Sequence, residues 1–231
     1  MKHLYIIVEG ETELEFVNRI LFPYLRSRGI RTHLQGLMIT MKGGGHGFNN
    51  IEHFKKTIQP LLYNDNQPII TTMIDHYGIN SEKKLPNYSI CIEEKDVEKR
   101  ILCMEQSLAN AVREINAAYR WFIPNITRHE TETFLFSDPE NGFSLEDDNI
   151  KNAVIEITKQ YSTIEDINSS PTTAPSKRLI KVYETYGKRY VKGADAIDIL
   201  EFTGIEKISE KCPRFRAWVE KIIAVMKNSM N

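Results

Sequence analysis

The sequence has few cysteines, almost no net charge and no long apolar run, and each shortage excludes a class of protein. Its three cysteines, Cys91, Cys103 and Cys212, form no CxxC pair among 231 residues. We therefore expect free thiols in a reducing compartment, and no zinc site. The apolar runs are too short to cross a bilayer, and no basic segment precedes an apolar one at the N-terminus. The sequence thus predicts a cytoplasmic protein that contacts no membrane.

The net charge of −1 gives no global field that would attract nucleic acid, so a polyanion site must be a local patch. Residues 176–192, SKRLIKVYETYGKRYVK, contain six cations and one acid, with three tyrosines between them. We expect Lys177 and Arg178 in the first turn of a helix that Thr173 or Ser176 caps. Because cations there oppose the helix dipole, a nucleic-acid phosphate held nearby would relieve the conflict. A solvated basic face is the alternative, with the tyrosines packed in the core rather than stacked on bases.

Apolar strands and amphipathic helices alternate along the first part of the chain. Buried strands are predicted at residues 3–8, 32–40 and 68–75, with a fourth that begins at Trp121 and continues through residues 129–138. Helices are predicted at residues 12–29, with Thr12 and Glu15 as a capping box, at 50–62, at 93–119, and throughout most of the chain after residue 147. This pattern predicts an α/β domain over residues 1–140, with a largely parallel central sheet flanked by helices, and a mainly helical C-terminal extension over residues 141–231 packed on it.

Two of the predicted strands end in an acid. In LYIIVEGETELEF, residues 4–16, Glu9 follows the first strand, and Asp75 closes the third. Ligands of parallel sheets bind beyond the carboxyl ends of the strands, so these two carboxylates face one crevice if their strands are neighbours. Carboxylates suit Mg²⁺ or Mn²⁺, which we expect as the cofactor, and a chance acid is the alternative for Glu9. Glu13, in the first turn of the next helix, is either a further ligand or a solvated residue favoured by the helix dipole.

Four segments occur in an order that resembles the Toprim domain shared by topoisomerases, primases and OLD-type nucleases. They are VEGETE at residues 8–13, DHYG at 75–78, HETETFLFSD at 129–138 and TAPSKRL at 173–179. The chain resembles in particular a family of small stand-alone Toprim-like proteins of bacteria. The resemblance implies a Toprim-like fold in which a glutamate after the first strand and a DxD after the third bind magnesium. Here Tyr77 replaces the second aspartate of DxD.

The segment HETETFLFSD offers substitutes for the missing acid. A spacing of two would put Glu130 and Glu132 on one face of a strand, with the alternating threonines on the other; an amphipathic edge strand is the alternative interpretation. We expect Glu130 or Glu132 as a metal ligand, Glu130 as a catalytic residue, and His129 as a general base or a phosphate contact. Together with Asp138, these acids supply enough carboxylates for one metal ion, and the binding of a second ion is left open.

Two functions fit these residues. The first is a magnesium-dependent nuclease, or another hydrolase of phosphodiester bonds, in which a metal on Glu9 and Asp75 activates water while Lys177 and Arg178 neutralise the backbone of DNA or RNA. The second is a non-catalytic Toprim-like module that binds nucleic acid or regulates a partner, which Tyr77 favours. The resemblance implies a partner ATPase and a setting in phage defence or mobile-element biology. The glycine-rich KGGGHGF, residues 42–48, lacks GK[ST] and predicts a flexible turn rather than a phosphate cradle.

Overall fold

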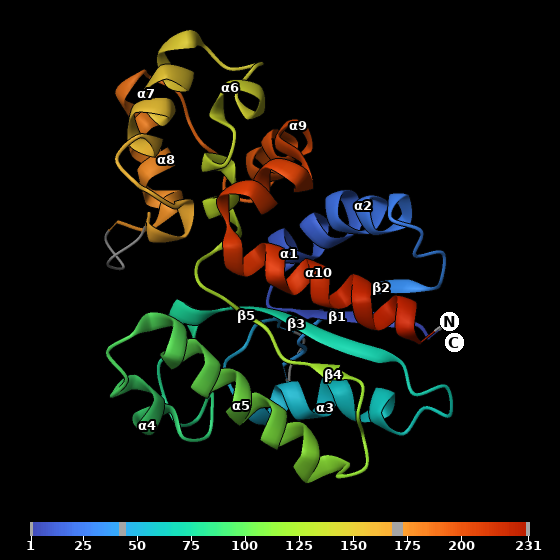
Figure 1. Ribbon diagram of the computed structural model, residues 1–231. Coiled ribbons are helices and arrows are strands. Elements are labelled where there is room, and N and C mark those ends of the chain that lie inside the picture. The colour runs from blue at the N-terminus through green and yellow to red at the C-terminus, as the bar shows by residue number, and fades with distance from the viewer. Residues whose placement is uncertain (1, 42–44, 168–172, 230–231) are drawn as a thin grey trace.

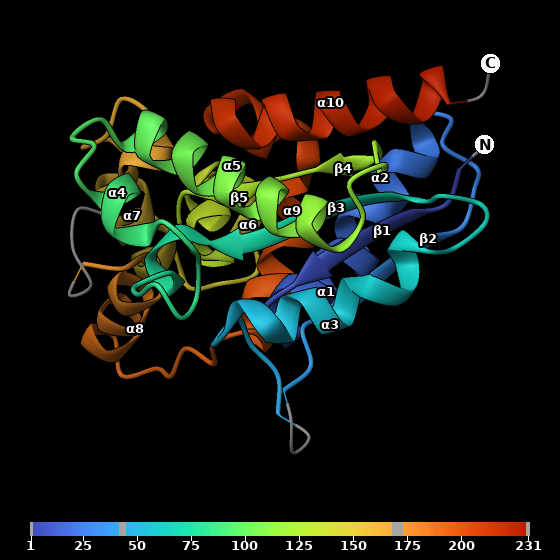
Figure 2. The same cartoon turned by 90° about the horizontal axis from the view of Figure 1, so that it is seen from below.

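A five-stranded parallel sheet organises the computed structural model, which describes residues 2–41, 45–167 and 173–229 (Figures 1 and 2). The strands are β1 (Leu4–Val8), β2 (Leu34–Met38), β3 (Ile69–Asp75), β4 (Phe122–Ile123) and β5 (Ile126–Thr127). Their order is β2-β1-β3-β4, and β5 pairs with the last residues of β3. Every strand pairing is parallel, as the alternation of strands and helices predicts.

Strands β1 and β3 are neighbours, and their register fixes the position of the strand-end acids. Val8 lies opposite Met73, so Glu9 and Asp75 both lie at the carboxyl-terminal edge of the sheet. The apolar side chains of both strands are buried because helices cover both faces. The condition under which the two carboxylates face one crevice, that the first and third strands are neighbours, is therefore met.

The helices lie on both faces of the sheet, with α1, α2 and α10 on one side and α3 and α5 on the other (Figure 1). The α-helices are α1 (Glu11–Phe16), α2 (Phe22–Ser27), α3 (Ile51–Leu62), α4 (Tyr88–Ile92), α5 (Val97–Ile115), α6 (Pro139–Gly142), α7 (Asp148–Thr158), α8 (Pro175–Thr185), α9 (Ala194–Lys211) and α10 (Pro213–Asn228). A π-helical segment at Val17–Leu21 joins α1 to α2, and 3₁₀ helices form at His76–Gly78, Thr131–Phe136 and Ile164–Asp166. The fold class predicted from the sequence is confirmed: a parallel α/β core is followed by a helical C-terminal part.

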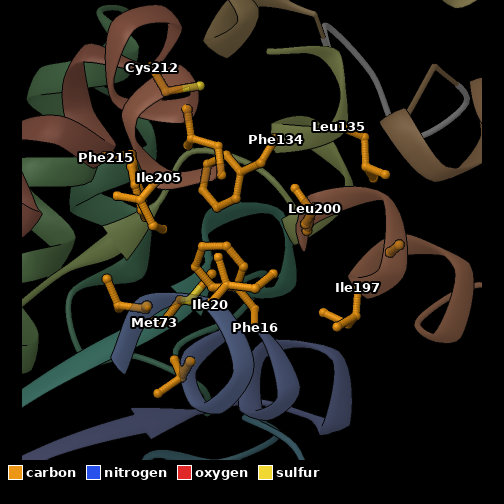
Figure 3. Packing of buried hydrophobic residues seen from close by; sticks show 14 of the residues in the cluster. Phe16, Ile20, Met73, Phe134, Leu135, Ile197, Leu200, Ile205, Cys212 and Phe215 are labelled. Carbon is orange, nitrogen blue, oxygen red and sulfur yellow. The ribbon is translucent and has the colours of Figure 1, made fainter. Parts of the chain in front are cut away.

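One hydrophobic cluster joins the sheet to the C-terminal helices. Phe16 of α1, Phe134 of a 3₁₀ helix and Phe215 of α10 pack together, with ring centroids 4.7 to 6.0 Å apart (Figure 3). Each buried phenylalanine contributes about 1.5 to 3 kcal/mol relative to an exposed one. In the same cluster, the indole Nε1 of Trp218 donates to the buried hydroxyl of Thr71 in β3 at 2.8 Å. The face of the sheet under α10 is thus closed by residues from the end of the chain.

Three local predictions are wrong. Residues 129–138 do not extend a strand, because residues Thr131–Phe136 form a 3₁₀ helix in which every residue is buried. The long helix predicted at 93–119 forms as α5, but its predicted bounds are wrong, since Asp96 accepts a hydrogen bond from the Lys99 amide as the N-cap and Asn116 is the C-cap. Helix α1 begins after Gly10 as its N-cap, without the capping box of Thr12 and Glu15.

The cysteines and the glycine-rich segment also differ from expectation. Cys91 of α4 and Cys103 of α5 form a disulfide, so the prediction of three free thiols is wrong, and Cys212 is free and buried. Residues 42–44 of KGGGHGF lie outside the described part of the chain, while Phe48 packs in the core. Among the described helices, none has the length and apolar character needed to cross a membrane.

Candidate metal centre

The two strand-end acids, Glu9 and Asp75, are in direct contact. Oε2 of Glu9 accepts a hydrogen bond from the backbone N–H of Asp75 at 2.9 Å. Gly78 leaves room for this arrangement, since a Cβ built on it would lie 3.1 Å from Oε1 and 3.3 Å from Oε2 of Glu9. The carboxylate of Asp75 caps the short 3₁₀ helix that follows, accepting from the Tyr77 N–H at 2.9 Å. Backbone geometry therefore fixes both carboxylates at the same edge of the sheet.

Glu13 reaches the same region from the first turn of α1. Its Oε1 accepts a hydrogen bond from the hydroxyl of Thr131 at 2.9 Å, so the first helix and the 3₁₀ helix at residues 131–136 meet here. Gly10 is packed closely against Glu13, with Oε2 at 3.3 Å from the position a Cβ would take. The predicted strand would point Thr131 away from the acids, whereas in the structure its hydroxyl contacts Glu13 in the acidic site.

Glu130 is held by two donors from the C-terminal part of the chain. Its Oε1 accepts from the Ser176 N–H at 2.6 Å, and its Oε2 lies 2.8 Å from Nζ of Lys192. Ser176 lies in the first turn of α8. The N-terminal end of this helix, which we expected beside a nucleic-acid phosphate, therefore faces the carboxylate of Glu130. The predicted caps are wrong, because the N-cap of α8 is Ala174.

Glu132 is the most unusual acid of the site. The residue is 0% exposed, and neither carboxylate oxygen has a hydrogen-bond partner among the described residues. The nearest cation is Lys192, whose Nζ lies 3.9 Å from Oε1, beyond hydrogen-bond distance. A buried carboxylate without donors is costly, so this position calls for a proton or a cation.

The electrostatics show that these acids share one environment. Burial, together with the charges of Glu9, Glu130 and Glu13, raises the pKa of Asp75 to about 7, although the hydrogen bond from the Tyr77 N–H acts to lower it. Burial likewise raises the pKa of Glu132 to about 7, with Lys192 opposing and Glu130 and Glu13 adding to the shift. Burial also raises the pKa of Glu9, and nearby Glu13 acts in the same direction.

Glu130 behaves differently from its neighbours. Burial acts to raise its pKa, but the hydrogen bonds from Lys192 and from the Ser176 N–H outweigh burial and lower it. Glu130 is therefore the acid of this group that its protein partners keep ionised. The structure thus brings together Glu9, Glu13, Asp75, Glu130 and Glu132, as the repulsion among their charges shows.

His129 lies behind this group, in the protein interior. It is 4% exposed, and its Nε2 donates to the carbonyl of Glu165 at 2.7 Å. Burial lowers the pKa of His129 to about 4, so the ring is neutral at pH 7. Its Nδ1 has no hydrogen-bond partner within the described residues, and its ring stacks on Tyr77. The role of His129 as a general base or a phosphate contact stays a prediction.

The remaining predicted residues lie around the site. Lys177 is exposed on α8, while Nε of Arg178 donates to the Thr173 carbonyl at 2.9 Å and its guanidinium lies over the Tyr161 ring. Asp138 is turned away, since its carboxylate caps α6 through the Asn141 N–H. Lys177 and Arg178 are thus on the first turn of α8, as predicted, next to the helix end that Glu130 occupies.

The structure brings two cations to the acids that sequence reasoning did not pair with them, although Lys192 belongs to the basic segment 176–192. Lys192 lies in the connection between α8 and α9, and Lys84 donates from Nζ to the Gly78 carbonyl at 2.6 Å, close enough to lower the pKa of Glu9. Both lysines are ordinary surface residues by sequence pattern. Only their distance in space from Glu9 and Glu130 identifies them as part of the site.

The acids fit a divalent cation by chemistry but do not form a finished coordination shell. In the described ranges, no three Asp, Glu, His or Cys side chains are placed together so as to hold a metal ion. Glu9 instead faces the Asp75 N–H, and Glu130 faces Lys192. All the possible ligands are carboxylates, which suit Mg²⁺ or Mn²⁺. The carboxylate oxygens of Glu132, which have no hydrogen-bond partner among the described residues, are the groups that a cation would satisfy.

The chain is similar to a known protein family and to a solved structure. No curated protein matches the chain. Among solved structures, the chain is similar to the C-terminal region of the OLD protein of Xanthomonas campestris pv. campestris, at 16% identity and a TM-score of 0.42, over 99% of this chain and 98% of that one. Residues 8–223 match the family described as a domain of unknown function, DUF4276. Since this match spans nearly the whole chain, the protein belongs to the DUF4276 family.

Proposed function

We propose that the protein is a metal-dependent enzyme that hydrolyses phosphodiester bonds in nucleic acid. Two observations support this best: the strand-end acids Glu9 and Asp75 are in contact, and Glu132 is a fully buried carboxylate without a hydrogen-bond donor among the described residues. The charges of Glu13 and Glu130 act on both Asp75 and Glu132. A divalent cation would satisfy these oxygens and offset the repulsion that raises the pKa values of Asp75 and Glu132.

The chain's own residues divide the work in this proposal. Glu9, Asp75 and Glu132 would hold the cation, with Glu130 and with Glu13, which Thr131 positions, as further ligands. When bound, Mg²⁺ or Mn²⁺ supplies positive charge opposite a transferring phosphoryl group. Lys84 and Lys177 would neutralise backbone phosphates of DNA or RNA beside the site. His129 would keep Tyr77 in position through their stacked rings.

A second candidate is a non-catalytic Toprim-like module that binds nucleic acid or regulates a partner ATPase. Two observations favour it: Tyr77 stands where the resemblance implies an acid, and Glu130 is already neutralised by Lys192. A site that balances its own charges does not need a metal to fold. This candidate predicts binding of DNA without divalent cations.

Metal binding and cleavage test the two candidates together. The full chain is titrated with Mn²⁺ by calorimetry and incubated with DNA and RNA in Mn²⁺ or in chelator. We expect Glu9→Gln and Asp75→Asn to lose both Mn²⁺ binding and cleavage. The control Glu11→Gln, which alters an exposed acid in the first turn of α1, should keep both. Cleavage that persists in both site variants overturns the proposal. DNA binding without Mn²⁺ binding supports the second candidate.

A further inference from the structure

Lys192 is the cation that this site already contains. Its Nζ lies 2.8 Å from Oε2 of Glu130 and 3.9 Å from Oε1 of Glu132, so it reaches between the two acids of the 3₁₀ segment. The charges of Glu132, Glu130 and Glu13 act to raise its pKa against the effect of burial. A single ammonium thus faces three carboxylates that come from two distant parts of the chain.

The lysine and the acids differ in how they are anchored. The side chain of Lys192 is 53% exposed, whereas that of Glu130 is 16% exposed and that of Glu132 is 1% exposed. A lysine has a long stem with several rotatable bonds, so its ammonium can turn out to solvent without moving the backbone. The side chain of Glu132 is buried and cannot turn out to solvent in this way. The acid is therefore fixed in position, and the cation beside it is replaceable.

Contacts of the neighbouring residues fix the backbone around Lys192, whereas the Lys192 side chain is about half exposed. Tyr190 is 6% exposed and packs against the ring of Tyr183, and the Val191 N–H donates to Oδ2 of Asp195 at 2.6 Å. Gly193, with a φ of 88°, leads into α9 and leaves its backbone close to Thr12. These contacts present the Lys192 side chain to the acids from a fixed point, without a hydrogen bond to Glu132.

We propose that Lys192 is a resident counter-ion that a divalent cation displaces from Glu130 and Glu132. The inference rests on the proposed metal site. A divalent cation bound to Glu130 and Glu132 would compete with the Lys192 ammonium for the same oxygens and repel it at these distances. Loading the site would therefore release the Lys192 ammonium toward solvent, where a nucleic-acid phosphate beside Lys177 offers it a new partner.

The first test measures Mn²⁺ binding to the full chain with and without this competitor. Lys192→Met removes the charge and keeps the stem, so we expect the Mn²⁺ dissociation constant to fall about tenfold, a difference of about 1.4 kcal/mol. Lys188→Met is the matched control, since Lys188 lies in the same connection but pairs with Glu146 and Asp147. Mn²⁺ affinity that is unchanged or weaker in Lys192→Met overturns the inference. If neither the natural chain nor the variant binds Mn²⁺, the proposed metal site fails as well.

A second test uses the natural chain and does not depend on the folding of a variant. Lysines are acetylated briefly with acetic anhydride, with Mn²⁺ or with chelator, and the modification of each lysine is read by mass spectrometry. An ammonium held by carboxylates reacts slowly, so displacement should raise the labelling of Lys192 by about threefold or more, while Lys188 stays constant. Lys192 labelling that stays level or falls when Mn²⁺ binds contradicts the displacement, even where binding itself is confirmed.

Discussion

The rings of Tyr77 and His129 are stacked, with centroids 5.4 Å apart and planes inclined by 15°. Tyr77 occupies the position two residues after Asp75, and it is 39% exposed. Its ring therefore covers the buried histidine while its backbone N–H binds the Asp75 carboxylate. The Toprim resemblance implies a metal ligand at this position, but here the tyrosine ring covers His129 instead.

Tyr77→Asp should convert this cover into a ligand. The 3₁₀ turn already holds the backbone of residue 77 against Asp75, so a carboxylate there adds a negative charge beside the strand-end pair. We expect Mn²⁺ to bind at least about fivefold more tightly, which corresponds to about 1 kcal/mol. Tyr77→Asn removes the same ring without adding charge and serves as the control. Equal Mn²⁺ affinities in the two variants would show that residue 77 lies outside the metal site.

Glu132→Gln should change how stability depends on pH. The folded-state pKa of Glu132 is raised from 4.5 to about 7 by burial, so its charge destabilises the fold progressively as the pH rises between these values. The neutral glutamine lacks this effect. In chelator at pH 8 we expect the variant to be more stable by up to about 3 kcal/mol, at about 1.4 kcal/mol per pKa unit.

The gap between Glu132→Gln and the natural chain should close as the pH falls below 4.5, where the carboxyl becomes protonated in both the folded and the unfolded state. Urea unfolding followed by circular dichroism at several pH values measures it. Glu15→Gln, which alters an exposed acid of α1, should show no such trend. A natural chain that is more stable than the variant at pH 8 in chelator would mean that Lys192 fully compensates the buried charge.

Gly78→Ala should disturb Glu9 without straining the backbone. The new methyl group would lie 3.1 Å from Oε1 of Glu9 and 3.3 Å from Oε2, which pushes the carboxylate away from the Asp75 N–H. We expect a loss of about 1 to 2 kcal/mol of stability, typical of a broken hydrogen bond to a charged group, and weaker Mn²⁺ binding. In a Glu9→Ala background the methyl group meets no carboxylate, so the double-mutant cycle should show a clear coupling energy. Simple additivity would exclude this contact.

Thr71→Val should weaken the attachment of α10 to the sheet. The Thr71 hydroxyl accepts from Nε1 of Trp218 and donates to the Ile123 carbonyl at 2.7 Å, and all three groups are buried. Valine leaves a donor and an acceptor unsatisfied, so we expect a loss of about 3 kcal/mol in urea unfolding. Thr127→Val, which removes one part-buried bond to the Ile74 carbonyl, should cost about 1 kcal/mol. Similar losses in both variants would refute a special role for the Trp218 contact.

The sheet and its strand-end acids could be predicted because their signals are local. The runs LYIIV and IITTMID are apolar on both faces, as the central strands of a parallel sheet require, and each leads directly to its acid. The neighbourhood of Glu9 and Asp75 then follows from the topology of parallel α/β sheets. These predictions needed no knowledge of side-chain contacts between distant segments.

The other half of the site could not be predicted for a physical reason. The alternation in HETETFLFSD favours a strand, yet the segment is buried on all sides, and the Thr133 N–H turns back to the Glu130 carbonyl in a 3₁₀ helix. Tertiary burial here overrides the local pattern. Similarly, the basic segment at 176–192 looks like a surface for polyanions, but Lys188 and Lys192 pair with acids of the same protein.

The position of α10 has a consequence for how the protein is made. Trp218 and Phe215 close the sheet face that β3 helps to form about 140 residues earlier in the chain. On the ribosome, a nascent polypeptide that has emerged only as far as Cys212 therefore lacks the part of the cover that α10 provides, although α1 and α2 lie on the same side of the sheet. Synthesis of α10, rather than of the sheet itself, ends the interval in which this part of the apolar surface is open to chaperones and proteases.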